Sequence, residues 1–215
     1  AEQQRTNAEL QLLKSQLHPH FLFNTLNNLY SHILDQSPKA PEIVLKLSAL
    51  LRFMIYESSD DISLGKEITL IEHYVALEKL RYEDRLDLSI VISGDTSGHR
   101  IAPLLLLPFL ENAFKHGASR QIDQCWISLH LSIDGNMMNF KLVNSVDNEA
   151  EPGGDKTGGL GLQNVQRRLD LLYPGGYTLQ MLTEDQVYVV NLELKLKESQ
   201  NTKIVEQSSM KVQTI

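Results

Sequence analysis

The chain has 215 residues, of which 42% are hydrophobic and 22% are charged, so it can bury a core and has room for one large domain or two small ones. Its formal net charge of -7 disfavours direct binding to the phosphate backbone of nucleic acids. The single cysteine, Cys125, excludes an internal disulfide and fits a reducing compartment, and no stretch approaches the roughly 18 consecutive apolar residues of a membrane helix.

Three amphipathic helices are predicted in the first part of the chain, at residues 1 to about 35, about 42 to 57 and about 64 to 83. Apolar residues three and four apart give each helix one packed face. Pro19 lies inside the first pattern and is expected to kink that helix. Because the connections are short and a small helical hairpin has more apolar surface than it can bury alone, dimerisation into a four-helix bundle is expected.

The second part of the chain mixes strands with helices. Strand patterns cover 88–92, 126–133, 138–143, 177–182 and 187–196, and helix patterns cover 103–117 and 161–173. Because these patterns do not alternate regularly, the fold class expected is α+β, with a sandwich of sheet and helices after the helical hairpin. The predicted domains are residues 1–83 (helical) and 84–197 (sandwich), followed by a polar tail at 198–215 that we expect to be disordered or to dock elsewhere.

The first candidate for chemistry is the stretch His18-Pro19-His20-Phe21-Leu22-Phe23-Asn24. His20 and Asn24 are four residues apart and therefore share one face of a helix. A neutral imidazole is a good nucleophile near pH 7, and its charge state is easily tuned. When the spacing is taken alone, a histidine that only packs beside a kink is the better explanation.

The second candidate is the stretch Glu111-Asn112-Ala113-Phe114-Lys115-His116-Gly117. Asn112 offers a neutral oxygen, which is the kind of ligand that Mg²⁺ prefers. Lys115 follows by nearly one turn and could meet a phosphate, and Glu111 could accept a proton. An amphipathic helix with a solvated polar face is an equally good alternative.

The third candidate is the glycine-rich run Gly153-Gly154-Asp155-Lys156-Thr157-Gly158-Gly159-Leu160-Gly161-Leu162, which leads into a predicted helix. Glycines let a backbone approach a phosphate closely, and a helix N-terminus attracts an anion. The run matches neither the P-loop nor the dinucleotide fingerprint, so a floppy hairpin remains an alternative.

Taken together and in this order, the three stretches resemble one family, the sensor histidine kinases of the LytS/YehU type. The stretch from Pro19 to Asn24 and the block Tyr74-Val75-Ala76-Leu77-Glu78-Lys79-Leu80-Arg81-Tyr82 resemble its dimerisation domain, over residues 16 to about 83. Residues 86 to about 196 resemble the ATP-binding domain of the GHKL group. The resemblance covers most of the chain and implies a catalytic core that moves the γ-phosphate of ATP onto its own histidine.

The resemblance implies roles for the matching residues. His20 matches the phosphoacceptor, and Asn112 matches the asparagine that holds Mg²⁺. The implied phosphate and lid contacts are Lys115, His116, Gly159, Leu160, Gly161 and Leu162. Residues 147–158 would form the lid over ATP.

Two departures from the family pattern affect these roles. The family's first glycine box usually reads Asp-x-Gly-x-Gly, and its aspartate contacts the adenine amino group. Asn144 stands in that place, and its carbonyl oxygen can accept the same hydrogen bond, although the glycines are missing. Many other histidine kinases have an acid directly after the phosphoacceptor, where this chain has Phe21, so Glu111 is the candidate base. Asn24 is expected to position water for the reverse, phosphatase reaction.

The implied partners are a second copy of the chain and a response regulator, of the LytTR type, whose aspartate takes the phosphate, so that any DNA contact is indirect. Because the first residue is Ala1, we expect the chain to be a fragment of a longer protein. The localisation expected is cytoplasmic, as the cytoplasmic part of an inner-membrane protein. The alternative function is a degenerate, nucleotide-binding dimeric scaffold without phosphotransfer, which the altered first glycine box favours. A GHKL ATPase of the chaperone or topoisomerase kind would leave the His20 stretch unexplained.

Overall fold

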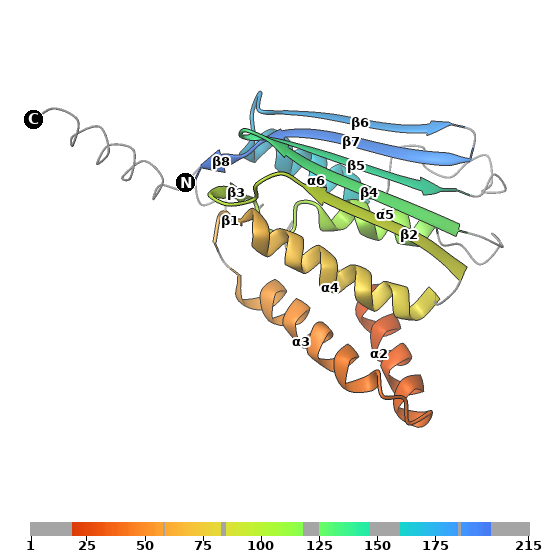
Figure 1. Cartoon of the computed structure of the whole chain (residues 1–215). Coiled ribbons are helices and arrows are strands. Elements are labelled where there is room, and N and C mark those ends of the chain that lie inside the picture. Colours follow the sequence, from red (N-terminus) through yellow and green to blue (C-terminus); the bar gives the residue numbers. More distant parts are fainter. Residues whose placement is uncertain are drawn as a thin grey trace, which may run out of the picture.

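The computed structural model describes residues 19–57, 59–82, 85–117, 125–146, 160–184 and 186–198 (Figure 1). In chain order its elements are α2 Pro19–Leu34, α3 Ala40–Tyr56, β1 Ile62–Ser63, α4 Leu64–Tyr82, β2 Leu86–Ser93, β3 His99–Ile101, α5 Leu107–Gly117, β4 Cys125–Asp134, β5 Met137–Ser145, α6 Leu160–Leu172, β6 Tyr177–Glu184, β7 Val187–Lys195 and β8 Lys197–Glu198. The predicted α+β class is confirmed. No helix within the described residues is long and apolar enough to cross a membrane.

Five strands form the main sheet in the order β2-β4-β5-β7-β6. β2 pairs with β4 in parallel, and the other neighbours are antiparallel. Successive side chains of a strand point to opposite faces, so in β4 Cys125, Ile127 and Leu129 are buried while His130 is exposed. Cys125 is thus a buried strand residue.

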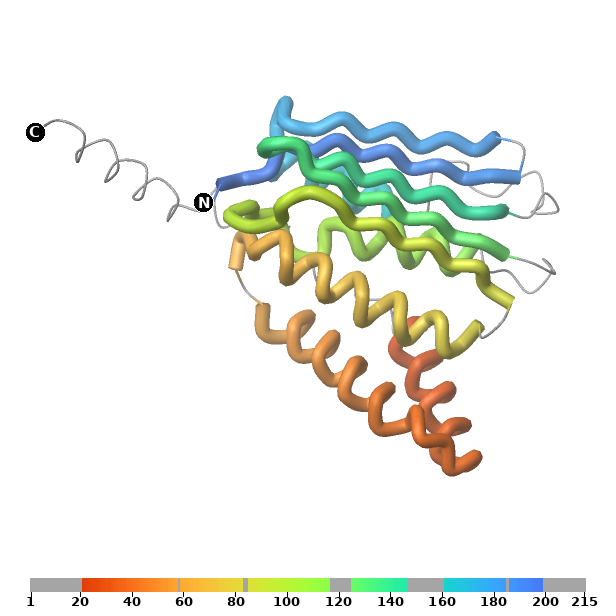
Figure 2. Tube along the Cα trace, viewed as in Figure 1, coloured from red at the N-terminus to blue at the C-terminus, as the bar shows by residue number. Residues whose placement is uncertain are grey.

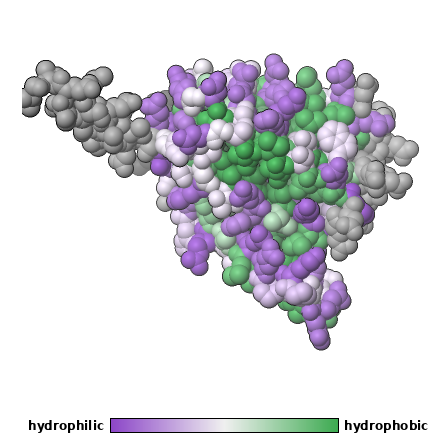
Figure 3. Space-filling view, viewed as in Figure 1, coloured by the Kyte–Doolittle hydropathy of each residue, from purple (hydrophilic) through white to green (hydrophobic). Residues whose placement is uncertain are grey.

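Helices α5 and α6 cover one face of this sheet, and α4 lies beside α5 near the β2 edge (Figure 1). Phe109 of α5 and Phe140 of β5 meet with ring centroids 5.8 Å apart. α6 buries Leu162, Val165 and Leu169, which follow one another at helical spacings of three and four. On the other face of the sheet, apolar side chains gather near the middle (Figure 3). The core therefore lies between one sheet and one layer of helices.

Helices α2 and α3 contact each other and project from the sandwich as a wedge (Figure 2). Large apolar side chains remain exposed on them, namely Phe23, Leu26, Tyr30, Ile33, Leu34, Val44, Leu45, Ile55 and Tyr56. An apolar surface of this kind marks a site of contact with a partner. The apolar surface that the expected dimer would bury is therefore exposed in the described part of the chain. The four-helix bundle itself stays a prediction.

A second, three-stranded sheet was not predicted from the sequence. β3 pairs with β1 on one side and with β8 on the other, both antiparallel. Asp61, directly before β1, forms an ion pair with Arg100 of β3, and its Oδ2 lies 3.6 Å from Nζ of Lys197 in β8. The connection between α3 and α4 is thereby tied to the last described residues of the chain. Strands of two or three residues are too short to show the alternation that predicts a strand.

The helix that was predicted at 103–117 begins later, at Leu107. The residues before it form an irregular loop, in which Leu104 has a φ of 58°. A left-handed backbone is uncommon for a leucine and interrupts a helix. The prediction of a helical turn at residues 103–106 was therefore wrong. The reason is that side chains from helices far away in the sequence hold these residues in a loop.

Side chains of α4 and α6 fix this loop from two sides. The carboxylate of Glu67, which is fully buried, accepts hydrogen bonds from the backbone N–H of Leu104 at 2.9 Å and of Leu106 at 3.0 Å. Arg168 of α6 is also buried and donates to the carbonyl oxygens of Pro103 at 2.6 Å and of Leu104 at 3.0 Å. Polar groups that water cannot reach are thereby paired, and the start of α5 is fixed against both other helices.

Glu67→Ala is expected to lower the free energy of unfolding by about 3 kcal/mol, because two buried N–H donors lose their acceptor at about 1–3 kcal/mol each. Urea denaturation followed by circular dichroism measures this change. Glu72→Ala is the matched control, since Glu72 is exposed on the same helix, and its effect should stay within about 0.5 kcal/mol. Equal effects of the two substitutions would contradict the role of Glu67 in holding the loop.

Candidate functional site

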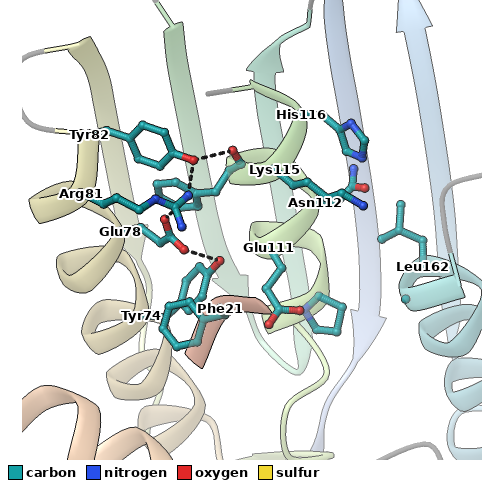
Figure 4. A pocket seen from close by; sticks show the side chains of 13 residues that line it. Phe21, Tyr74, Glu78, Arg81, Tyr82, Glu111, Asn112, Lys115, His116 and Leu162 are labelled. Atoms are coloured by element: carbon teal, nitrogen blue, oxygen red, sulfur yellow. Dashed lines mark hydrogen bonds and ion pairs between the residues drawn. The ribbon is translucent and has the colours of Figure 1, made fainter. Parts of the chain in front are cut away.

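A cavity of about 540 Å³ lies among α4, α5 and the first turns of α2 and α6. It is lined by Phe21, Tyr74, Glu78, Arg81, Tyr82, Pro108, Glu111, Asn112, Phe114, Lys115, His116, Gly161 and Leu162 (Figure 4). The fold thereby brings together parts of the chain that are far apart in sequence. The predicted site residues on its wall are Glu111, Asn112, Lys115, His116, Gly161 and Leu162.

Helix α5 supplies the central polar part of the wall. Consecutive helical residues point about 100° apart, so Glu111 and Asn112 face different parts of the cavity. Figure 4 shows Glu111 on the side of Phe21, and Asn112 on the side of His116 and Leu162. Both Glu111 and Asn112 are half-buried. A carboxyl group and a side-chain amide are thereby kept on separate sides of one helix.

The last turn of α5 adds basic side chains at the opening of the cavity. Lys115 and His116 line the cavity and are exposed. Desolvation and the nearby charge of Lys115 lower the pKa of His116, which favours the neutral imidazole. The ammonium group of Lys115 suits an anionic ligand such as a phosphate.

The opposite wall comes from α4, where the spacing of Glu78 and Arg81, three residues apart, is typical of a helix-stabilising surface pair. Glu78 is instead 3% exposed. Its Oε2 lies 2.7 Å from Nη2 of Arg81, and its Oε1 accepts a hydrogen bond from the Tyr74 hydroxyl at 3.2 Å. A signal for this burial was present, because Glu78 follows Tyr74 by four residues on the helix face that carries Leu70 and Leu77.

Arg81 connects the carboxylate of Glu78 to α5. Its guanidinium donates a hydrogen bond to the Tyr82 hydroxyl and lies 4.4 Å from the centroid of the Tyr82 ring. The Tyr82 hydroxyl donates to the carbonyl oxygen of Phe114 at 3.2 Å. A continuous chain of polar contacts thus runs from α4 to the backbone of α5 and joins the two walls of the cavity.

The carboxyl group of Glu78 titrates near neutral pH. Burial raises the pKa of Glu78 to about 7; the charge of Arg81 and the hydrogen bond from Tyr74 oppose this shift, and the charge of Glu111 adds to it. Burial, together with the charges of Glu78 and Glu111, also raises the pKa of Tyr74. Three acidic groups therefore share one electrostatic environment beside a single guanidinium.

Asn144 lies apart from the cavity wall, near the end of β5. Its side chain is fully buried, and its Nδ2 donates a hydrogen bond to the carbonyl oxygen of Ser145 at 2.9 Å. Its Oδ1 has no hydrogen-bond partner within the described part of the chain. A buried acceptor without a partner costs about 1–3 kcal/mol, so a donor on a ligand, such as an adenine amino group, would be favoured there.

Other predicted site residues are described in part or not at all. His20 lies in the first turn of α2, directly before the cavity residue Phe21, and only its backbone is described. Asn24 is half-buried one turn later and does not line the cavity. The side chain of Leu160, together with Gly159 and the expected lid at 147–158, lies outside what the structure describes.

The described residues suit a magnesium ion that is held largely by phosphate. They contain no group of three His, Cys, Asp or Glu side chains that could hold a metal ion. Mg²⁺ usually keeps several waters and takes one or two protein oxygens beside the substrate phosphates. The half-buried amide of Asn112, on the cavity wall, can supply such an oxygen.

Comparisons with known proteins give a consistent result. Residues 8–86 match the family model described as "Histidine kinase". Sensor histidine kinase BtsS of Escherichia coli K12 is 30% identical over 189 residues, which cover 85% of this chain and 32% of BtsS. Sensor histidine kinase YpdA of the same organism is 31% identical over 210 residues, which cover 89% of this chain and 36% of YpdA. The chain therefore spans about a third of the length of these relatives.

Among solved structures, this chain is similar to the histidine kinase domain of the blue-light activated histidine kinase EL346 from Erythrobacter litoralis. The similarity covers 90% of this chain and 96% of that domain, with a TM-score of 0.49 and 16% sequence identity.

The stability of the chain should fall as the pH rises from 5 to 8, because the folded chain holds the Glu78 proton more tightly than the unfolded chain. This contribution is complete below about pH 4.5, the ordinary pKa of glutamate, and is lost as the pH rises through about 7. The change amounts to about 2 kcal/mol. Glu78→Gln cannot titrate and should flatten the dependence.

Urea denaturation at several pH values measures this effect. Glu72→Gln, exposed on the same helix, is the control and should keep the wild-type dependence. The same pH dependence in the wild type and in Glu78→Gln would contradict the assignment.

Proposed function

We propose that this chain, which belongs to the histidine kinase family, binds ATP in the cavity among α4, α5 and α6 and transfers the γ-phosphoryl group to His20. The observation that carries the proposal is that Phe21, the residue directly after His20, lines the same cavity as Glu111 and Asn112. Phosphoryl transfer requires the nucleophile and the phosphate-binding groups to be positioned together. Phe21 packs the helix of His20 against Tyr74 of α4, at the cavity that those groups also line.

Binding and charge neutralisation account for most of the catalysis in such a transfer. Asn112 would hold Mg²⁺ together with phosphate oxygens, and the ion would neutralise charge on the phosphates. Lys115 supplies a further positive charge from the same helix. Gly161 and Leu162, in the first turn of α6, offer backbone N–H groups that suit a phosphate.

The transfer itself makes one bond and breaks one. A nitrogen of His20 attacks the γ-phosphorus, so that an N–P bond forms. The bond from that phosphorus to the bridging oxygen breaks, and its electron pair leaves with ADP. Glu111 is the proposed acceptor of the proton that the imidazole loses, since it faces the side of the cavity where Phe21 packs (Figure 4). The phosphate then passes to an aspartate of a response regulator, which we propose to be of the LytTR type.

The chain would act as part of a larger, dimeric protein. Residues 1–83 would form the dimerisation and phosphoacceptor domain, 84–197 the ATP-binding domain and 198–215 a tail. The exposed apolar side chains of α2 and α3 would be buried against a second copy in a four-helix bundle. We propose a cytoplasmic position for this part, in a parent protein anchored in the inner membrane. Asn24, one turn after His20, would position water for dephosphorylation.

A degenerate scaffold that binds nucleotide without transferring phosphate is the second candidate. The segment at Asn144 lacks the glycines of the family's first glycine box, and this departure favours it. The presence of His20, Asn112 and the cavity residues favours the kinase. The two candidates differ in whether phosphate is transferred to the chain.

Incubation with γ-labelled ATP and Mg²⁺ is expected to place acid-labile, alkali-stable label on the wild-type chain and none on His20→Gln. His32→Gln, on the same helix, is the matched control and should be labelled like the wild type. Equal label on the wild type and His20→Gln would remove His20 as the acceptor. Nucleotide binding without label on the wild type would favour the scaffold.

Asn144→Leu is expected to weaken ADP binding about tenfold to a hundredfold, because a buried hydrogen bond to the adenine amino group is lost at about 1–3 kcal/mol. Isothermal titration calorimetry measures the affinity. Asn139→Leu is the control, since Asn139 is exposed on the same strand, and it should bind ADP like the wild type. A folded Asn144→Leu chain with unchanged affinity would refute the adenine contact.

A further inference from the structure

The first turn of α2 is packed against the cavity of its own chain. Phe21 is 9% exposed, and its ring centroid lies 4.8 Å from that of Tyr74 in α4. Tyr74 meets Phe114 of α5 edge-on, with centroids 5.7 Å apart. Aromatic side chains from three helices thus form one cluster, and its Phe21 end lies on the side of the cavity that Glu111 faces (Figure 4).

The buried side chains among the described residues of α2 lie toward the end that carries His20. Phe21 and Thr25 are buried, whereas Leu26 and Ile33 are exposed. The Thr25 hydroxyl donates a hydrogen bond to the carbonyl oxygen of Phe21 at 2.9 Å, so the polar atom of this buried side chain is paired. Burial of a phenylalanine side chain contributes about 1.5–3 kcal/mol, enough to favour the docked position of this turn.

Short connections keep α2 near the cavity of the same chain. Residues 35–39 join α2 to α3, and residues 57–61 join α3 to β1. β1 is itself held by its pairing with β3. A segment of five residues spans at most about 18 Å. The connection therefore keeps the end of α3 close to the α4 of its own chain, and the contact of Phe21 with Tyr74 places the first turn of α2 at the same helix.

We infer that phosphoryl transfer runs in cis, so that the nucleotide bound by one subunit phosphorylates His20 of the same subunit, with Phe21 and Tyr74 as positioning residues. This inference rests on the proposed function. The N–P bond forms on the chain whose own Asn112 helps to hold the nucleotide, the bridging P–O bond breaks, and its electron pair leaves with ADP. The imidazole proton passes to Glu111 of that chain. In a dimer, each subunit is then complete for the transfer.

Two mixed dimers test the direction, each made from co-expressed chains with different tags and purified on both tags in succession. The first pairs His20→Gln with Asn112→Ala. The second pairs the wild-type chain with a chain that carries both substitutions. Each dimer is incubated briefly with γ-labelled ATP and Mg²⁺, and the label on each chain is measured after separation.

Transfer in cis labels the wild-type chain of the second dimer and leaves the first dimer without label. Transfer in trans gives the reverse, with label on the Asn112→Ala chain of the first dimer and none in the second. Label in the first dimer would therefore overturn the inference, whether or not the second is also labelled. The wild-type homodimer is the reference: if it takes no label, the proposed function fails, and the direction of transfer is no longer at issue.

The positioning role of Phe21 has its own test. Phe21→Ala is expected to slow labelling at saturating ATP by at least about tenfold, equivalent to about 1.4 kcal/mol in the barrier, with unchanged affinity for ATP. Phe21→Leu keeps most of the buried volume and should restore most of the rate. If Phe21→Ala weakens ATP binding and leaves the saturated rate unchanged, Phe21 only forms part of the nucleotide pocket and does not position His20.

Discussion

The loop that precedes α5 is the constraint on which the candidate site depends. Glu67 of α4 holds two of its N–H groups, and Arg168 of α6 holds two of its carbonyl oxygens. With both partners buried, the loop keeps a left-handed backbone at Leu104 that no helix would allow. α5 must therefore begin at Leu107, which sets the faces on which Glu111 and Asn112 lie. One buried network thus orients three helices around the cavity.

Local sequence patterns predicted most of the fold. The α+β class and the strands of the main sheet follow from alternation and helical spacing, which depend on neighbouring residues only. The strands β1, β3 and β8 were not predicted, because their stability comes from pairing between segments that are far apart in the sequence. The late start of α5, at Leu107 and not at residue 103, was missed for a related reason. Glu67 and Arg168 hold the loop before it from helices that are far away in the sequence.

The sequence also indicated much of the candidate site, and the comparisons confirm the resemblance to LytS/YehU-type sensor histidine kinases. Motif residues such as Asn112 and Gly161 lie on one cavity wall, while the role of each stays a prediction. Glu78 and Arg81 were underestimated, because an acid and a base three residues apart look the same on an exposed helix and on a buried one. The place of Glu78 on the helix face of Tyr74 and Leu77 did indicate burial, whereas the link from Arg81 through Tyr82 to α5 depends on tertiary packing that spacing within α4 does not reveal.

The small sheet of β1, β3 and β8 has a practical consequence for anyone who modifies the chain. β3 lies between β1, which belongs to the joint that connects α3 to α4, and β8, the last described strand. Asp61 in this joint forms ion pairs with both Arg100 and Lys197. A reporter or purification tag fused directly after Glu198 would therefore sit beside the joint, not at a remote end. Its bulk would sterically restrict bending between α3 and α4. Removal of β8 would take away one of the contacts that hold this joint and would make it more mobile.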